Sequence, residues 1–200
     1  MNTTHTSMNP SFHRYLATVA AALLACTAAS AGAALITFTP ATAKVSVGTQ
    51  VAVDLEVQLP GDLISAFDFA VNWDAAILTL EGIDFGPSLG GPLDSIQDFT
   101  GVAGSVSVAE TSLLTNLGGL QNGGDFRLFT LYFNPIGLGI SALSITPGAV
   151  AGYLFDNAGD PLPDVVPGGA TITATPVPAP LLLVLPGLVL LANRVGRQRR

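Results

Sequence analysis

The sequence predicts an all-β protein: one β-sandwich domain between two hydrophobic segments at the ends of the chain. Three observations predict it. Through the middle of the chain apolar and polar residues alternate with a period of two, glycine and proline recur at short intervals, and no amphipathic helical pattern interrupts them. Many short strands joined by frequent turns are typical of two packed sheets.

The clearest strands lie in the first half of this domain. In Val51–Gln58 valine and leucine occupy alternate positions, and residues 67–73 alternate in the same way. We therefore expect half-buried antiparallel strands, with Trp73 in the core because it shares the phase of the apolar residues. Asp74 predicts one capped helical turn directly after Trp73.

The later strands are predicted from the same signals. The alternation resumes at Leu78, and Gly82 marks a bulge. Residues 126–133 are apolar on both faces, which predicts a central strand. Shorter strands are expected at five further places: Leu35–Thr39, 102–109, 140–146, 150–155 and 170–174.

The N-terminal residues 1–33 have the features of a secretory signal peptide. The first residues carry no acid, residues 16–25 are apolar, and small residues such as Ala29 and Ala31 suit signal peptidase. The chain is therefore expected to cross the inner membrane. The residues before Cys26 partly match a lipobox, which leaves lipidation of Cys26 as an alternative.

The C-terminal residues 176–200 combine a proline-rich elbow, an apolar run and an arginine-rich end. The apolar run, 181–192, would span roughly 18 Å as a helix, against a hydrocarbon core of roughly 30 Å. Positively charged flanks stay in the cytoplasm. We therefore expect a hydrophobic helix that anchors the exported domain in the membrane at least transiently, before it reaches the cell surface or the extracellular space.

The domain between these segments, residues 34–175, is strongly acidic. All 14 acidic residues of the chain lie within it, and Lys44 and Arg127 are its two basic residues, so its net charge is −12. Such a surface repels the phosphates of nucleic acids. Nucleic acid is therefore excluded as a partner.

The same domain lacks two residue types on which much chemistry depends. His5, His13 and Cys26 all precede it, so it contains neither histidine nor cysteine. Disulfides, the usual zinc, copper and haem sites, and Ser-His-Asp or Cys-His catalysis are excluded. A hydrolase would have to rely on carboxylates.

The C-terminal segment resembles the PEP-CTERM sorting signal of Gram-negative bacteria. In that family a Pro-Glu-Pro box precedes a hydrophobic stretch and an arginine-rich end, and here Ala179 stands at the position of the glutamate. The resemblance implies an exosortase-type sorting enzyme as a partner. The residues that carry it are Val177, Pro178, Ala179, Pro180, Arg194, Arg197, Arg199 and Arg200.

The central domain resembles a cohesin. The resemblance rests on residues 47–53 and 66–78, which match the opening strands, and on 155–160 and 168–172, which match the closing turn and strand. It implies a jelly-roll β-sandwich over 34–175 that binds a protein partner. Cohesins of cellulosomes bind dockerins, whereas the sorting signal here implies a biofilm or exopolysaccharide matrix.

The sequence offers few candidate site residues. Oxygen ligands for calcium occur close together at four positions, although Asx-Gly turns are common without metal: Asp156, Asn157, Asp160 and Asp164. No other cofactor is indicated. The carboxylate pairs considered for glycoside hydrolysis are Asp94 with Asp98 and Asp68 with Asp84. Trp73 is also considered for sugar stacking, although its phase in the strand favours the core, and Tyr132 and Tyr153 are the candidates for an exposed aromatic row.

These observations favour a non-enzymatic protein of the envelope or extracellular matrix, whose cohesin-like module binds a protein partner by its sheet faces or edges. The alternative is a carbohydrate-binding module for exopolysaccharide. A glycoside hydrolase is the third hypothesis, and the alternation of acidic with apolar residues along the strands speaks against it, because acids in that pattern usually form the solvated face of a sheet.

Overall fold

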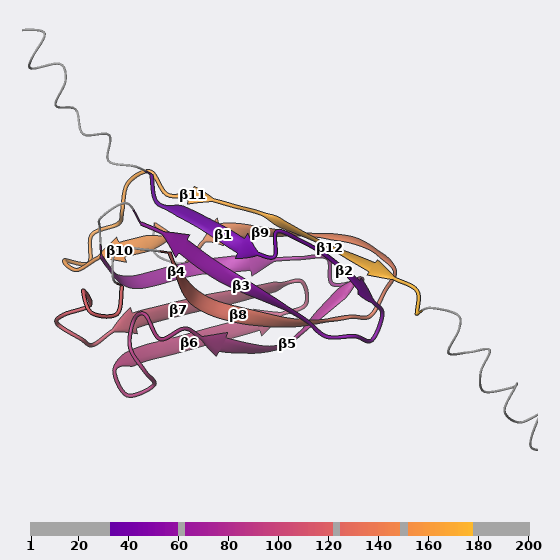
Figure 1. The fold of residues 1–200 in the computed structure, drawn as a ribbon, viewed down its shortest axis with the longest axis horizontal. Helices are drawn as coiled ribbons and strands as arrows, with labels where there is room; N and C mark the ends of the chain where they lie inside the picture. Colours follow the sequence, from indigo (N-terminus) through magenta and orange to yellow (C-terminus); the bar gives the residue numbers. More distant parts are fainter. Residues whose placement is uncertain (1–32, 60–62, 122–124, 149–151, 178–200) are drawn as a thin grey trace, which may run out of the picture. The chain divides into compact units, whose positions relative to one another are not determined.

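The computed structural model describes residues 33–59, 63–121, 125–148 and 152–177, which belong to one compact unit. All regular elements in these ranges are strands, and they form two sheets (Figure 1). None of the described elements is a helix of the length and hydropathy needed to cross a bilayer. The two sheets confirm the predicted all-β sandwich.

The first sheet has five strands in the order β11-β1-β3-β8-β5. Its pairs are antiparallel except that of β11 with β1. The strands are β1 (Leu35–Thr39), β3 (Val51–Gln58), β5 (Leu78–Phe85), β8 (Phe126–Pro135) and β11 (Val166–Pro167).

The second sheet has seven strands, six of them in the order β2-β12-β9-β4-β7-β6. The seventh strand, β10, pairs with the first part of β4, and β9 pairs with the second part. β2 runs parallel to β12. The strands are β2 (Thr42–Ser46), β4 (Ile64–Asn72), β6 (Ser95–Val102), β7 (Ser105–Ser112), β9 (Gly139–Pro147), β10 (Leu154–Asp156) and β12 (Ala170–Thr175).

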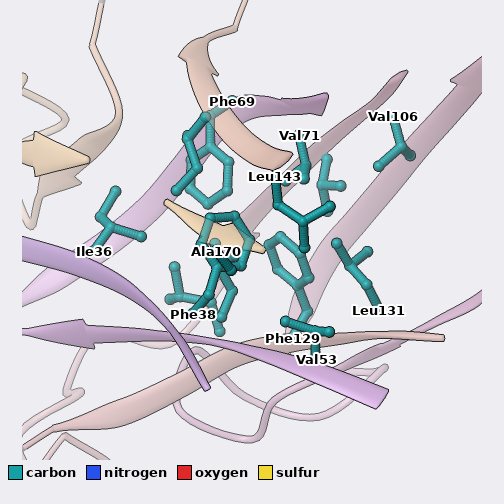
Figure 2. Close-up of a cluster of buried hydrophobic side chains, with 14 of the residues drawn as sticks. Ile36, Phe38, Val53, Phe69, Val71, Val106, Phe129, Leu131, Leu143 and Ala170 are labelled. Carbon is teal, nitrogen blue, oxygen red and sulfur yellow. The ribbon is translucent and has the colours of Figure 1, made fainter. Parts of the chain in front are cut away.

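The apolar residues of each alternating strand meet between the sheets. Three phenylalanines from both sheets pack together in this core, and Figure 2 labels two of them, Phe69 and Phe129. The ring centroids of Phe67, Phe69 and Phe129 are 5.2–5.7 Å apart, and all three side chains are buried. This tilted stacking is favourable for aromatic rings and adds to the burial of apolar surface.

Several predicted strands are confirmed in detail. β1 and β3 have the predicted bounds, and β8 is flanked by β3 and β5. The register of β5 against β8 shifts between Leu80 and Gly82, which confirms the bulge. Asp74 closes the predicted turn, since its carboxylate accepts a hydrogen bond of 2.9 Å from the Ala76 amide.

The strand predicted over 102–109 corresponds to β7, but it was predicted to begin and end three residues too early. The chain reverses between β6 and β7, and Gly104 adopts a φ of 85°, which glycine accommodates without steric cost. β6 itself and β2 were not predicted. Within 150–155 the strand begins only at Leu154, and residues 149–151 lie outside the described part of the chain.

Trp73 is only half buried, although it packs on the core. Its indole N–H donates a hydrogen bond of 3.0 Å to the carbonyl of Leu78, and its ring meets Phe133 edge-on at 5.2 Å. The prediction that Trp73 packs in the core is therefore confirmed for one side of its ring only. The other side is available to line a surface groove.

Candidate functional site

The outer face of the five-stranded sheet carries charges that are already paired. Arg127 lies 3.8 Å from the carboxylate of Asp54, and it donates a hydrogen bond of 2.9 Å to Thr130, whose hydroxyl donates to the same carboxylate. The hydroxyl of Thr39 donates to Glu56 at 2.7 Å. A partner on this face would have to displace existing polar contacts.

The outer face of the seven-stranded sheet is different, because small side chains cover its middle. The strand registers place these residues side by side on β4, β7 and β9, with Asp68 as the charged member of the set. We call this set the Ala/Ser/Thr face: Ala66, Asp68, Ala70, Asn72, Ser105, Ser107, Ala109, Thr111, Ala142, Ser144 and Thr146.

Exposed aliphatic side chains flank this face. On β6, Ile96 and Val102 are 61% and 68% exposed, and on β9 Ile140 is 66% exposed. The centres of protein interfaces are depleted in charge, and exposed apolar groups beside a flat surface are typical of binding sites. The Ala/Ser/Thr face with its aliphatic margins is therefore the stronger candidate interface of the two.

A groove separates the edge strands of the two sheets, β5 and β6, which lie side by side in Figure 1. We call it the edge groove. Its Trp73 compartment, about 420 Å³, is lined by residues that include Leu80, Glu81 and Val102. Its Gln97 compartment, about 680 Å³, also includes Asp84 and Arg127. Ile83 and Phe99 line both compartments.

A buried carboxylate lies behind Gln97. Glu110 is 1% exposed, and its Oε1 accepts hydrogen bonds from Ser95 at 2.7 Å and Gln97 at 2.9 Å. Its Oε2 is buried without a hydrogen-bond partner among the described residues. Burial raises the pKa of Glu110, and the bonds from Gln97 and Ser95 offset this only in part.

Glu110 was missed by the sequence analysis, although a signal was present. Val106 and Val108 on β7 are buried, and Glu110 continues their inward phase. The predicted strand ended at residue 109 and therefore did not include Glu110. Its position in the strand is typical of a core residue, so a carboxylate there is unusual.

Three of the four calcium candidates, Asp156, Asn157 and Asp160, lie in one turn, which the side chain of Asp156 stabilises. The Asp156 carboxylate accepts hydrogen bonds from the amides of Ala158 at 2.8 Å and Asp160 at 2.9 Å, and Asn157 lies exposed in the same turn. Asp164 lies beyond it, with a φ of 57°. No group of three or more acidic, histidine or cysteine side chains in the described ranges is placed to hold a metal ion.

The structure does not bring the candidate carboxylate pairs together. Asp68 lies on β4 and Asp84 on β5, in different sheets. Asp94 precedes β6 and Asp98 lies within it, both exposed. Four residues of nearly extended chain span roughly 13 Å, more than either geometry of glycoside hydrolysis requires.

The two candidate tyrosines do not form a sugar-binding row either. Tyr132 lies on β8 in the five-stranded sheet, whereas the carbonyl of Tyr153 accepts a hydrogen bond from Asp68 of the seven-stranded sheet. Both are half buried. Of the sorting-signal residues, Val177 is exposed at the end of the described part, and the residues from Pro178 onward lie outside it.

Comparison with known proteins gives matches among solved structures, whereas no family model and no curated protein matches the sequence. A non-cellulosomal cohesin from the archaeon Archaeoglobus fulgidus is 16% identical with a TM-score of 0.55, over 72% of this chain and 92% of that one. The cohesin of the Coh-OlpA-Doc918 complex from Clostridium thermocellum is 17% identical with a TM-score of 0.57, over 72% and 100%.

A third match is the sixth cohesin of scaffoldin B from Acetivibrio cellulolyticus, solved with the Cel5 dockerin. It is 18% identical with a TM-score of 0.58, over 72% of this chain and 100% of that one. The described residues thus form a two-sheet β-sandwich module in which the outer face of the seven-stranded sheet is mostly neutral and β6 forms an open edge. More particularly, its fold is cohesin-like, and at these identities the likeness is one of fold.

Proposed function

We propose that this protein is an exported, non-catalytic module that binds a protein partner through the Ala/Ser/Thr face. The observation that carries the proposal is the distribution of charge. The domain has a net charge of −12, yet this face carries small neutral side chains around Asp68, with exposed aliphatic residues at its margins. The cores of interfaces between soluble proteins are likewise depleted in charged residues.

The small side chains of this face suit a folded partner. Alanine, serine and threonine leave the sheet flat, so that a helix or sheet of the partner can approach the backbone closely, and the hydroxyls offer hydrogen bonds at the rim. Two of the similar structures are cohesins solved in complexes with dockerins. By analogy of fold, a dockerin-like protein domain is the partner class we propose.

A catalytic role is not part of the proposal. The carboxylates considered for hydrolysis do not form a catalytic pair: Asp68 and Asp84 lie on different sheets, and Asp94 and Asp98 are exposed, without the apolar pocket that keeps one acid protonated beside an ionised one. The exposed row of aromatic residues that would favour carbohydrate binding is not formed by Tyr132 and Tyr153, because Tyr132 lies on β8 of the five-stranded sheet and Tyr153 lies in the chain before β10 of the other sheet. A protein partner is therefore the hypothesis that the surface supports best.

Ala70→Arg tests the proposed face, because Ala70 lies at its centre between Ser107 of β7 and Thr146 of β9. We expect the arginine to weaken partner binding at least about thirtyfold, as for the loss of a hot spot of about 2 kcal/mol. The partner is captured from the extracellular fraction on the immobilised full chain, identified by mass spectrometry, and titrated against both variants.

The matched control is Ala52→Arg, which places the same side chain on an exposed position of β3 in the five-stranded sheet. This variant should bind as the wild type does. Equal binding by Ala70→Arg and the wild type would refute the proposed face. Retention of matrix polysaccharide in place of a protein would favour the carbohydrate-binding alternative.

We further propose that the chain is sorted by an exosortase-type enzyme and held in the membrane on the way to the cell surface or matrix. Support comes from the signal peptide pattern of 1–33 and the tripartite pattern of 176–200. Deleting 178–200 should release the domain into the periplasm or medium, as measured by fractionation and immunoblotting.

A second variant separates sorting from simple anchoring. Replacing Pro178 and Pro180 by alanine keeps the apolar run and the arginines. If an enzyme recognises the proline box, the unprocessed chain should accumulate in the membrane. Unchanged fractionation of the deletion variant would contradict anchoring, and normal processing of the double alanine variant would contradict recognition of the box.

A further inference from the structure

β6 is an edge strand with an unusual lack of protection. It pairs with β7 over eight continuous residues without a bulge, and no other described strand pairs with it. Natural proteins guard such edges with lysine, proline, bulges or a covering segment. Ser95–Val102 contains neither lysine nor proline, and Asp98 is its one charged residue.

The free side of β6 faces the edge groove. Gln97, Phe99 and Gly101 share one face of the strand, because they pair with the inward-facing Glu110, Val108 and Val106 of β7. Gln97 lines one compartment, Gly101 lines the other, and Phe99, 55% exposed, lines both. Along β6, Phe99 therefore lies between the two compartments, with Gln97 two residues before it in one compartment and Gly101 two residues after it in the other.

We propose that β6 binds an extended peptide as an added strand. The unpaired backbone groups of β6 supply the hydrogen bonds, and alternate side chains of the peptide enter the groove. The residue opposite Phe99 must be small. The residues two positions before and after it, roughly 13 Å apart, enter the Trp73 compartment and the Gln97 compartment.

Charge identifies the peptide as cationic. Glu81 lies in the Trp73 compartment without a basic residue beside it in the lining, the Gln97 compartment holds Asp84 together with Arg127, and Asp98 is exposed on the outward face of β6, where the lysines of an added strand would lie. A lysine or arginine opposite Asp98 would form a favourable cross-strand pair. A second copy of this domain, also at −12, would be repelled, which disfavours pairing of β6 with itself.

This site adjoins the Ala/Ser/Thr face at β6, but its strand pairing and its groove contacts do not involve the residues of that face on β4 and β9, so either proposal can fail alone. The probe is a fluorescein-labelled peptide, Lys-Val-Lys-Ala-Lys-Val-Lys, capped at both ends. It places valine, alanine and valine on one face and lysines on the other, and it reads the same in both directions. Its binding to the full chain in detergent is measured by fluorescence anisotropy. The charge control is a second peptide in which glutamate replaces every lysine.

N-methylation distinguishes strand addition from simple charge attraction. Alternate amides of an added strand point to β6 and to solvent. One peptide is methylated on the valine and alanine nitrogens, the other on the lysine nitrogens. We expect one set to lose binding by at least about tenfold, the loss of about 1.4 kcal/mol of hydrogen bonding, and the other set to retain it. Equal affinity of the two methylated peptides would overturn the proposal.

Variants of β6 locate the peptide. A Cβ on Gly101 would meet nothing nearer than Val106 Cγ2 at 4.0 Å, so Gly101→Leu can fill the Trp73 compartment without disturbing β7, and it should weaken binding. Asp98→Lys should weaken the lysine peptide and strengthen the glutamate peptide. Ala70→Arg should leave peptide binding unchanged. If Gly101→Leu and Asp98→Lys bind as the wild type does, the peptide binds elsewhere and the assignment to β6 is wrong.

Discussion

Replacing Phe129 by alanine is expected to lower the free energy of unfolding by about 3–5 kcal/mol, the usual loss for a buried aromatic side chain. Phe129 is 0% exposed, and its ring centroid lies 5.6 Å from that of Phe67 and 5.7 Å from that of Phe69, both in the opposite sheet. Figure 2 shows Phe129 and Phe69 in the core. A cavity there would remove contacts on both sides of the core, and the rigid strands around it cannot collapse to fill it.

The measurement is urea unfolding followed by the fluorescence of Trp73, the single tryptophan of the chain. Phe99→Ala is the matched control, because it removes the same atoms from a ring that is 55% exposed on β6. It should cost no more than about 1 kcal/mol, in line with the smaller area it buries. Equal losses for both variants would show that Phe129 does not connect the two sheets as described.

Much of the fold follows from local patterns, because burial on one face of a strand leaves a period of two in the sequence. β1 and β3 could be placed to the residue, and the two-sided apolar pattern of β8 predicted its place between two neighbours. β6 escaped prediction because an edge strand beside a groove has no fully buried face: most of its residues are exposed. The pairing of β2 with β12 joins distant segments, which no local pattern records.

The candidate surfaces were harder to predict than the fold. Alanine, serine and threonine signal no chemistry individually, and the Ala/Ser/Thr face exists only once the registers of β4, β7 and β9 are known. The edge groove likewise joins β5 and β6, which belong to different sheets. The acidic residues around Asp156 suggested a calcium site, whereas in the structure the Asp156 carboxylate accepts hydrogen bonds from amides of its own turn.

The second large effect is expected at Glu110. Burial raises its pKa above the ordinary value of 4.5, so the folded state binds this proton more tightly than the unfolded state. The stabilisation by protonation is complete below pH 4.5 and is lost as the pH rises through the raised pKa of the folded state. Above that pKa the cost of burying the ionised carboxylate is constant. Stability should therefore fall with rising pH across this window.

Glu110→Gln removes the titration and keeps the shape of the side chain, including an oxygen that accepts from Ser95 and Gln97. At pH 7 and above we expect the variant to be about 1–2 kcal/mol more stable than the wild type, since it no longer buries a charge, with little difference at pH 4. Urea unfolding at several pH values measures this.

Asp98→Asn is the matched control for Glu110→Gln, because it also removes one negative charge but from an exposed position on β6. The domain has a net charge of −12, so removing any one negative charge relieves some repulsion. Asp98→Asn measures how much of the increase in stability of Glu110→Gln comes from that relief alone. If burial is the cause, only Glu110→Gln flattens the fall of stability with pH. Parallel pH profiles for the two variants would instead mean that Glu110 is ionised in the fold at little cost, with its second oxygen reached by water.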